Sequence, residues 1–234
     1  AMRFTAWAAQ LVSGDGGVRD AVSAEWSALD DAPAACDTAL QAAYASARVH
    51  EDAVWRRARR QVDTRKPDNA RLTWNWLPAD SAPPAAQVEQ ALKSSAAWLD
   101  RLPPNFAVTR AGRELVLAAL TRVARADPRA AYTRLLSVQD RLGAEERSHI
   151  HGVIAMHAAI EQLPEALDLY RAANTAELSP LQRAWRVRAA LRALDWNAVR
   201  SAIEAMPEAE RELPEWTYWL GRAHWGQGWM TRVG

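Results

Sequence analysis

The sequence predicts an all-α protein, and three observations support this. Apolar residues recur every three or four positions, the period of an amphipathic helix and not the alternation of a strand. A capping residue followed by proline opens several segments, as at Asp127-Pro128 and Ser179-Pro180. Hydrophobic residues make up 49% of the 234 residues, enough for a substantial core. We therefore expect one helical domain over residues 1–234.

The predicted helices are short and follow one another closely. They cover Arg3–Val12, Val18–Leu29, Ala34–Arg48, Glu51–Val62, Asp68–Leu77, Ala85–Leu102, Thr109–Ala126, Pro128–Leu142, Glu145–Gln162, Pro164–Ala173, Pro180–Leu194, Asp195–Met206 and Pro214–Ala223. A single hairpin of such helices is too thin to bury its apolar face, so stacking must supply the core; we expect an α-superhelix (solenoid) of about a dozen short antiparallel helices. The proline-rich stretch "LPADSAPPAAQ" (Leu77–Gln87) is predicted to be a loop within this array.

Apolar stripes define the buried faces of the helices that begin at Pro128, Pro180 and Asp195. The predicted stripe residues are Ala131, Leu135, Val138 and Leu142; then Leu181, Ala184, Val187, Leu191 and Leu194; then Trp196, Val199, Ile203 and Met206. Gly143 is expected to end the first of these helices in a left-handed conformation. Pro207 is expected to end the third.

Three aromatic residues lie close together in "MPEAERELPEWTYWLGRA" (Met206–Ala223). Behind Pro214, Trp216 and Trp219 share one helical stripe with Leu220 and Ala223, which predicts that both indoles pack on the preceding hairpin. Truncating Trp219 to alanine is accordingly expected to cost on the order of 3–5 kcal/mol. Tyr218 lies off the stripe. The alternative is that these rings form a platform for a sugar.

Charge, cysteine content and histidine spacing exclude several kinds of site. Lys+Arg number 29 against 28 Asp+Glu, a balance that does not support nucleic-acid binding. Cys36 is the only cysteine, and "HEDAVW" has Val54 where a zinc protease motif needs its second histidine. His157 shares a stripe with apolar residues and is predicted to be a core histidine. No metal or other cofactor is expected, and no stretch has the roughly 18 apolar residues of a membrane span.

Two short motifs are candidate binding sites. "WRRARRQ" concentrates arginines, among them Arg56 and Arg60, and is either a solvated helix face with ion pairs or a patch for a polymer that carries carboxylates. In "WNW", Trp74 and Trp76 diverge by about 200° if they are helical, so one ring is either exposed or buried against another element. This pair is the best candidate for an aromatic contact with a sugar.

Three stretches resemble the helical superdomain of soluble lytic murein transglycosylases. They run from Trp26 to Leu77, from Val123 to Ala159 and from Arg183 to Ala223, in collinear order, and "DW…V…I..MP" followed by "W.YWLGRA" is the most specific part. The resemblance implies a curved, U-shaped superhelix. It also implies a periplasmic parent enzyme that cleaves peptidoglycan between N-acetylmuramic acid and N-acetylglucosamine and forms a 1,6-anhydro ring.

In that family a single glutamate acts as acid and then as base, in a C-terminal lysozyme-like domain marked by a Glu-Ser pair and a Gly-Leu-Met-Gln segment. Neither motif occurs in the 234 residues, so no catalytic residue is carried over. We expect a fragment that is inactive alone and helps to position the glycan strand. The N-terminal "AMRFTAWAAQ" has no basic region before a long apolar run, so no signal peptide is expected in this chain.

The resemblance also sets expectations about partners and Cys36. Peptidoglycan glycan strands are the expected partner, through the full-length protein, together with other proteins of cell-wall synthesis or degradation. Some family members have a second cysteine near the positions of Asn69–Arg71, where this chain has none, so Cys36 is expected to be a buried apolar residue or a free thiol. An alternative from another class is a free-standing α-solenoid adaptor, similar to tetratricopeptide-repeat proteins, that binds a protein partner in its groove.

Overall fold

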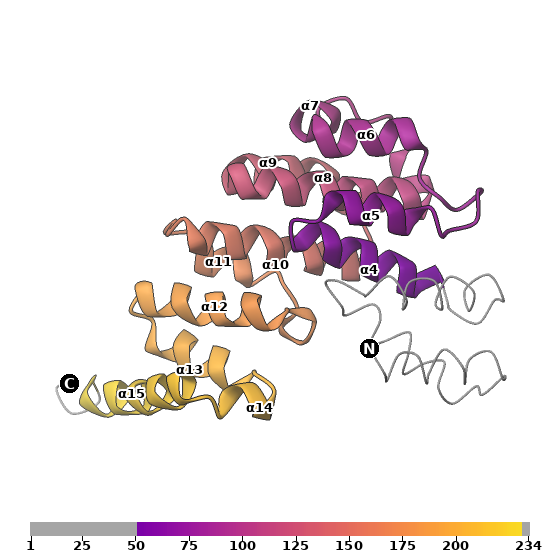
Figure 1. Ribbon diagram of the computed structural model, residues 1–234. Helices are drawn as coiled ribbons and strands as arrows, with labels where there is room; N and C mark the ends of the chain where they lie inside the picture. The colour runs from indigo at the N-terminus through magenta and orange to yellow at the C-terminus, as the bar shows by residue number, and fades with distance from the viewer. Residues whose placement is uncertain (1–50, 231–234) are drawn as a thin grey trace, which may run out of the picture. The chain divides into compact units, whose positions relative to one another are not determined.

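The computed structural model describes the backbone of residues 51–230 and the side chains as far as residue 225. The expected helices Arg3–Val12, Val18–Leu29 and Ala34–Arg48, and with them Cys36, lie outside the described residues. Between residues 51 and 230 the chain forms helices and no strand, which confirms the all-α prediction (Figure 1). The chain divides into two compact units, Ala1–Arg122 and Val123–Gly234.

The described part of the first unit contains five α-helices and one 3₁₀ turn. They are α4 (Glu51–Asp63), α5 (Pro67–Trp74), α6 (Ala85–Lys93), α7 (Ser95–Leu99), η1 (Phe106–Val108) and α8 (Arg110–Ala126), whose last residues belong to the second unit. Helices α4 and α5 pack as a hairpin. In helix α8 every residue from Glu114 to Thr121 is buried.

The predicted helix Ala85–Leu102 is interrupted. It forms α6 and α7, separated at Ser94, whose φ of −123° and ψ of 45° leave the helical region. The hydroxyl of Ser95 donates a 2.6 Å hydrogen bond to the carbonyl oxygen of Ala91. Serine side chains that bond to the backbone compete with the helical ladder, which accounts for the break.

The second unit is a succession of helices in which each long helix packs against the next. Its elements are α9 (Pro128–Val138), η2 (Gln139–Arg141), α10 (Ala144–Ile160), α11 (Ala166–Tyr170), η3 (Thr175–Glu177), α12 (Pro180–Arg192), α13 (Trp196–Glu204), α14 (Glu208–Arg211) and α15 (Pro214–Met230). Helix α9 packs on α10, α10 on α12, α12 on α13, and α13 on α15 (Figure 1). Within this unit the helices are therefore stacked in chain order, as in a helical array.

Capping side chains begin the helices where the sequence places them. An Asp127 carboxylate oxygen accepts the amide hydrogen of Ala130 at 2.9 Å, and an Asp195 oxygen accepts that of Ala198 at the same distance. Ser179 forms a reciprocal capping box with Gln182, with distances of 3.2 and 2.8 Å. These bonds satisfy amides that have no partner within the helix.

The prediction for Gly143 is wrong. Its φ of −65° and ψ of 162° are extended, and it begins α10 instead of ending α9 in a left-handed conformation. Its amide donates a 2.7 Å hydrogen bond to the carboxylate of Glu146, three residues into α10. Helix α9 already ends at Val138, and the 3₁₀ turn η2 leads from it to Gly143.

Among residues 51–230, three helices end with a residue other than glycine in the left-handed conformation. These residues are Arg65, Gln162 and Leu194, with φ between 54° and 67°. At the end of α10, Gln162 donates to the carbonyl of Ala159 at 3.1 Å and Leu163 donates to that of Ala158 at 2.9 Å. This is the Schellman pattern, in which glycine is the usual residue because a Cβ atom is strained there.

The predicted stripe of α12 is wrong at both ends. Val187 is fully buried, but Leu181 is 56% and Leu194 is 73% exposed. The buried face instead includes Gln182 and Arg183. Both polar side chains have partners: Gln182 completes the capping box, and Arg183 donates a 2.8 Å hydrogen bond to Glu210. Periodicity of apolar residues cannot reveal such a face, because polar residues become buried once their hydrogen bonds are satisfied.

Helix α10 is buried on almost all sides, because α9, α11 and α12 pack against it. His157 is buried, as predicted for a core histidine. His151 is buried as well, and its ring lies edge-on to Tyr132 with centroids 6.1 Å apart.

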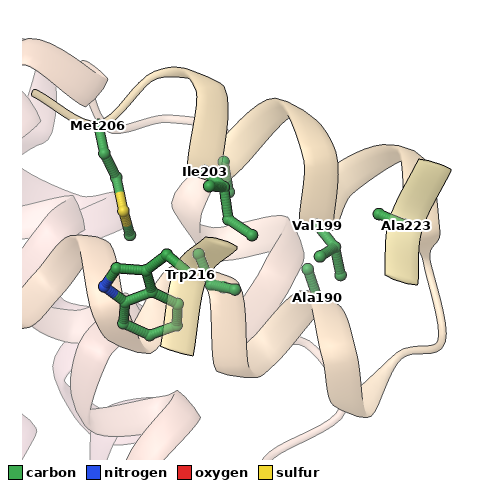
Figure 2. Close-up of a cluster of buried hydrophobic side chains, with 8 residues drawn as sticks. Ala190, Val199, Ile203, Met206, Trp216 and Ala223 are labelled. Carbon is green, nitrogen blue, oxygen red and sulfur yellow. The ribbon is translucent and has the colours of Figure 1, made fainter. Parts of the chain in front are cut away.

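Trp216 anchors the hydrophobic cluster between α12, α13 and α15. Its indole is 5% exposed and lies beside the thioether of Met206, with Val199 and Ile203 on the adjoining turns of α13 (Figure 2). Trp219 and Leu220 are only partly buried and pack at the margin of this cluster. Tyr218 is 59% exposed. The packing prediction is therefore confirmed for Trp216 and Ala223 and holds in part for Trp219.

Candidate functional site

The tryptophans of the "WNW" motif differ in accessibility. Trp74 ends α5 and is 3% exposed, so its indole offers almost no surface to a ligand. Trp76 lies in the turn after α5 and is partly buried. The contact of these rings with a sugar remains a prediction, and Trp76 is the residue for which the geometry allows it.

The arginines of "WRRARRQ" do not form one continuous cationic face. Arg56 is exposed and Arg60 is partly buried, but Arg57 is buried within the first unit. Arg59 reaches from α4 to the buried carboxylate of Glu114 on α8, with N–O distances of 3.1 and 2.7 Å. The ion-pair interpretation therefore accounts for Arg59, and a ligand role remains a prediction for Arg56 and Arg60.

A hollow in the second unit brings together residues that the sequence did not single out. Two adjoining cavities of about 300 and 520 Å³ share Ala159, Gln162 and Arg192 in their walls. We call the larger cavity the α12 groove; it is lined by Ala159, Gln162, Trp185, Arg188, Leu191, Arg192 and Leu194. Its walls come from the end of α10 and from α12 with the turn that follows it.

Two arginines give the α12 groove a positive charge. The guanidinium carbon of Arg188 lies 5.1 Å from the ring centroid of Trp185 and 5.5 Å from that of Trp216. Arg192 lines the same groove one turn further along α12, and no Asp or Glu is among the lining residues. Between residues 51 and 225, neither Arg188 nor Arg192 has a carboxylate partner.

The spacing of residues on α12 and the turns at the helix ends position the side chains of this groove. Trp185, Arg188 and Arg192 occupy positions i, i+3 and i+7 of α12, so their side chains share one face. Gln162 and Leu194, in their left-handed conformations, turn the chain at the ends of α10 and α12. The spacing of tryptophan and arginines in "WRVRAALR" was the available signal. It was missed because the apolar stripe was assigned to Leu181 and Leu194.

Buried carboxylates are the natural candidates for acid catalysis, because burial favours a protonated carboxyl group. In residues 51–225 only Glu114 and Glu146 are buried acids. Glu114 is paired with Arg59, and Glu146 accepts the amide of Gly143. Both carboxylates therefore serve the fold. In the same part of the chain no three His, Cys, Asp or Glu side chains are grouped as metal ligands, and no described helix is long and apolar enough to cross a membrane.

Comparisons with known proteins give a relationship at the level of the fold. No known protein family matches the chain, and no curated protein sequence matches it. Among solved structures, an inactive mutant of the lytic transglycosylase Slt from Pseudomonas aeruginosa matches with a TM-score of 0.63. The chain is similar in fold to a lytic transglycosylase. The similarity covers 94% of this chain at 23% sequence identity, and it spans 36% of the length of Slt.

Proposed function

We propose that the chain is the non-catalytic helical scaffold of a periplasmic lytic transglycosylase that degrades peptidoglycan. The observation that carries the proposal is the fold similarity to Slt, which extends over 94% of this chain. The collinear sequence resemblance to the helical superdomain of that family supports it independently.

The proposal assigns bond cleavage to another part of the parent protein. The 234 residues contain no Glu-Ser pair and no Gly-Leu-Met-Gln segment. The two buried carboxylates of the described part are held by Arg59 and by the amide of Gly143, so neither is free to protonate a glycosidic oxygen. The helical array would then act by binding: it holds the glycan strand while a glutamate elsewhere catalyses formation of the 1,6-anhydro ring.

The test compares the full-length protein encoded by the gene with residues 1–234 alone on purified cell-wall sacculi. We expect the full-length protein to release 1,6-anhydromuropeptides, measured by chromatography and mass spectrometry, and the chain alone to release none. Release by the chain alone would contradict a non-catalytic scaffold. A full-length protein without cleavage activity would contradict the parent enzyme and favour the helical adaptor.

A further inference from the structure

The α12 groove combines a hollow, an aromatic wall and two arginines without acidic partners. We propose that it binds an acidic sugar: a pyranose whose carboxylate is attached to the sugar itself. This inference rests on the proposed function for the identity of the polymer, a peptidoglycan strand, in which the lactyl group of muramic acid supplies such a carboxylate when it bears no peptide.

The contacts of Arg188 determine which of its N–H groups are available to a ligand. Its guanidinium lies over the rings of Trp185 and Trp216, at 5.1 and 5.5 Å from their centroids. A cation–π contact engages the face of the guanidinium and leaves its in-plane N–H groups available for hydrogen bonds. Two indoles thus fix the side chain in advance, which lowers the entropy lost when it binds.

The residues next to Arg188 limit the class of ligand to a sugar that bears a carboxylate. Arg192 is exposed and has neither a hydrogen-bond partner nor an ion-pair partner in the described part of the chain. Two arginines on one helix face suit a carboxylate, which guanidinium groups bind in bidentate fashion. Because Trp185 lies about 5 Å from Arg188, a ligand that contacts both must hold an apolar face next to its carboxylate. A pyranose that carries its acid on the sugar itself, on the ring or through a short ether such as the lactyl group, has this form.

The size and composition of the hollow agree with this ligand. About 520 Å³ lies within the usual range for small-molecule sites. Gln162 adds an amide to the wall, and Leu191 and Leu194 add apolar surface. The exposure of Leu194 then has a role, because a bound sugar would cover its side chain.

The experiment measures the affinity of the purified chain for three saccharide probes by isothermal titration calorimetry. One is an oligomer of alternating N-acetylglucosamine and N-acetylmuramic acid without peptides, which has free lactyl carboxylates. The second is the same glycan with its stem peptides, in which the lactyl groups are amides and the carboxylates lie on the peptides. The third is a neutral chitin oligomer. We expect the first to bind about tenfold or more tightly than either of the others.

Variants identify the residues responsible. Arg188→Ala and Arg192→Ala are each expected to weaken binding of the acidic glycan about tenfold or more, and to leave binding of the chitin oligomer unchanged. Arg222→Ala is the matched control: it removes an arginine that lies 5.9 Å from Trp225 on α15, outside the groove. Arg192 is exposed without a partner, so its variant keeps the fold even if Arg188→Ala is destabilised.

The failure of this inference differs from the failure of the proposed function. Equal affinity for acidic and neutral glycans, unchanged affinity in both groove variants, or preference for the peptide-bearing glycan would overturn the groove assignment. If the chain still binds sacculi in those cases, the scaffold proposal stands. Polygalacturonate, an acidic polysaccharide unrelated to peptidoglycan, separates the two proposals. If the chain binds it, Arg188→Ala and Arg192→Ala abolish that binding, and no peptidoglycan probe binds, then the groove assignment stands and the scaffold proposal is wrong. Failure to bind any acidic saccharide would overturn the assignment of the α12 groove as a site for an acidic sugar.

Discussion

The guanidinium of Arg59 and the carboxylate of Glu114 form a two-point ion pair across the first unit, 55 residues apart in the chain. The side chains are 10% and 3% exposed. Arg110 adds a second cation 3.5 Å from the same carboxylate. This pair ties α4 to α8, and it explains why the arginine run of α4 is not simply a solvated face.

Replacing Glu114 with alanine should therefore destabilise the fold strongly. The variant removes the carboxylate that faces the mostly buried guanidinium of Arg59, so we expect the unfolding free energy to fall by about 3–5 kcal/mol. The measurement is chemical denaturation monitored by circular dichroism. Glu89→Ala is the control, because the pair of Glu89 with Lys93 is exposed and should contribute at most about 1 kcal/mol. Equal losses in the two variants would show that the Glu114 pair is not structural.

The two tryptophans of α15 should differ in their contribution to stability. Trp216→Ala removes the anchor of the α12–α13–α15 cluster and should cost about 3–5 kcal/mol. Trp219 is only partly buried, so its truncation should cost less than half as much, which revises the expectation from the sequence. Urea unfolding of both variants measures the difference. A larger loss for Trp219→Ala would contradict the assignment of Trp216 as the buried ring of this cluster.

Two glycines should respond to alanine in opposite directions. A Cβ atom at Gly112 would lie 1.9 Å from the carbonyl oxygen of Phe106, so the backbone of η1 or α8 must move, at a cost of about 1–3 kcal/mol. A Cβ atom added at Gly221 on α15 would have no atom of a neighbouring element within 4 Å, so nothing opposes the change to alanine. Alanine should stabilise the helix by about 0.5–1 kcal/mol. Thermal denaturation gives the sign of each change. A stabilising Gly112→Ala would rule out the close approach of η1 to α8.

The end of α12 should be stabilised by glycine. Leu194 has a φ of 54° and is mostly exposed, so its replacement by glycine relieves backbone strain and loses little buried surface. We expect Leu194→Gly to raise the unfolding free energy by about 1 kcal/mol. Leu194→Ala is the control, because it retains a Cβ atom in the same conformation and should give no gain. A gain from both would assign the effect to the leucine side chain instead of the backbone.

His151 should make the second unit less stable in mild acid. Burial, and to a lesser degree the charge of Arg147, lowers the pKa of His151 below its ordinary value of 6.5. The folded state therefore resists protonation while the unfolded state binds a proton with the ordinary pKa. The contribution is present above pH 6.5 and is lost as the pH falls from there toward the folded pKa. Unfolding free energies between pH 7.5 and 5 should fall less steeply in His151→Gln than in the native chain; identical slopes would contradict this.

Much of the fold was predictable, because local signals determine it. The helix starts predicted at Asp127, Ser179 and Asp195 are confirmed. Each of these side chains accepts a hydrogen bond from the amide three residues further along the chain. The period of Val199, Ile203 and Met206 likewise identifies the buried side of α13. Such features depend on neighbours in sequence and need no tertiary information.

The predictions that were wrong depended on partners distant in sequence. Arg183 is buried on the inner face of α12, where it donates a hydrogen bond to Glu210, 27 residues away. Gly143 is an exception, because the group that holds it is local: Glu146, three residues further along the chain, accepts its amide hydrogen. Besides the wrongly assigned stripe of α12, distance in sequence concealed the α12 groove, since Gln162 and Arg192 come together only when α10 and α12 pack. For Arg56, Arg60 and Trp76 a role in binding remains a prediction.

The proposed function requires that this helical chain binds peptidoglycan and does not cleave it. The most direct measurement is co-sedimentation of the purified chain with intact sacculi, with analysis of the soluble products in the same sample. We expect the chain to sediment with the sacculi and the supernatant to contain no 1,6-anhydromuropeptides. A chain that stays wholly in the supernatant, or that releases anhydromuropeptides, would contradict it.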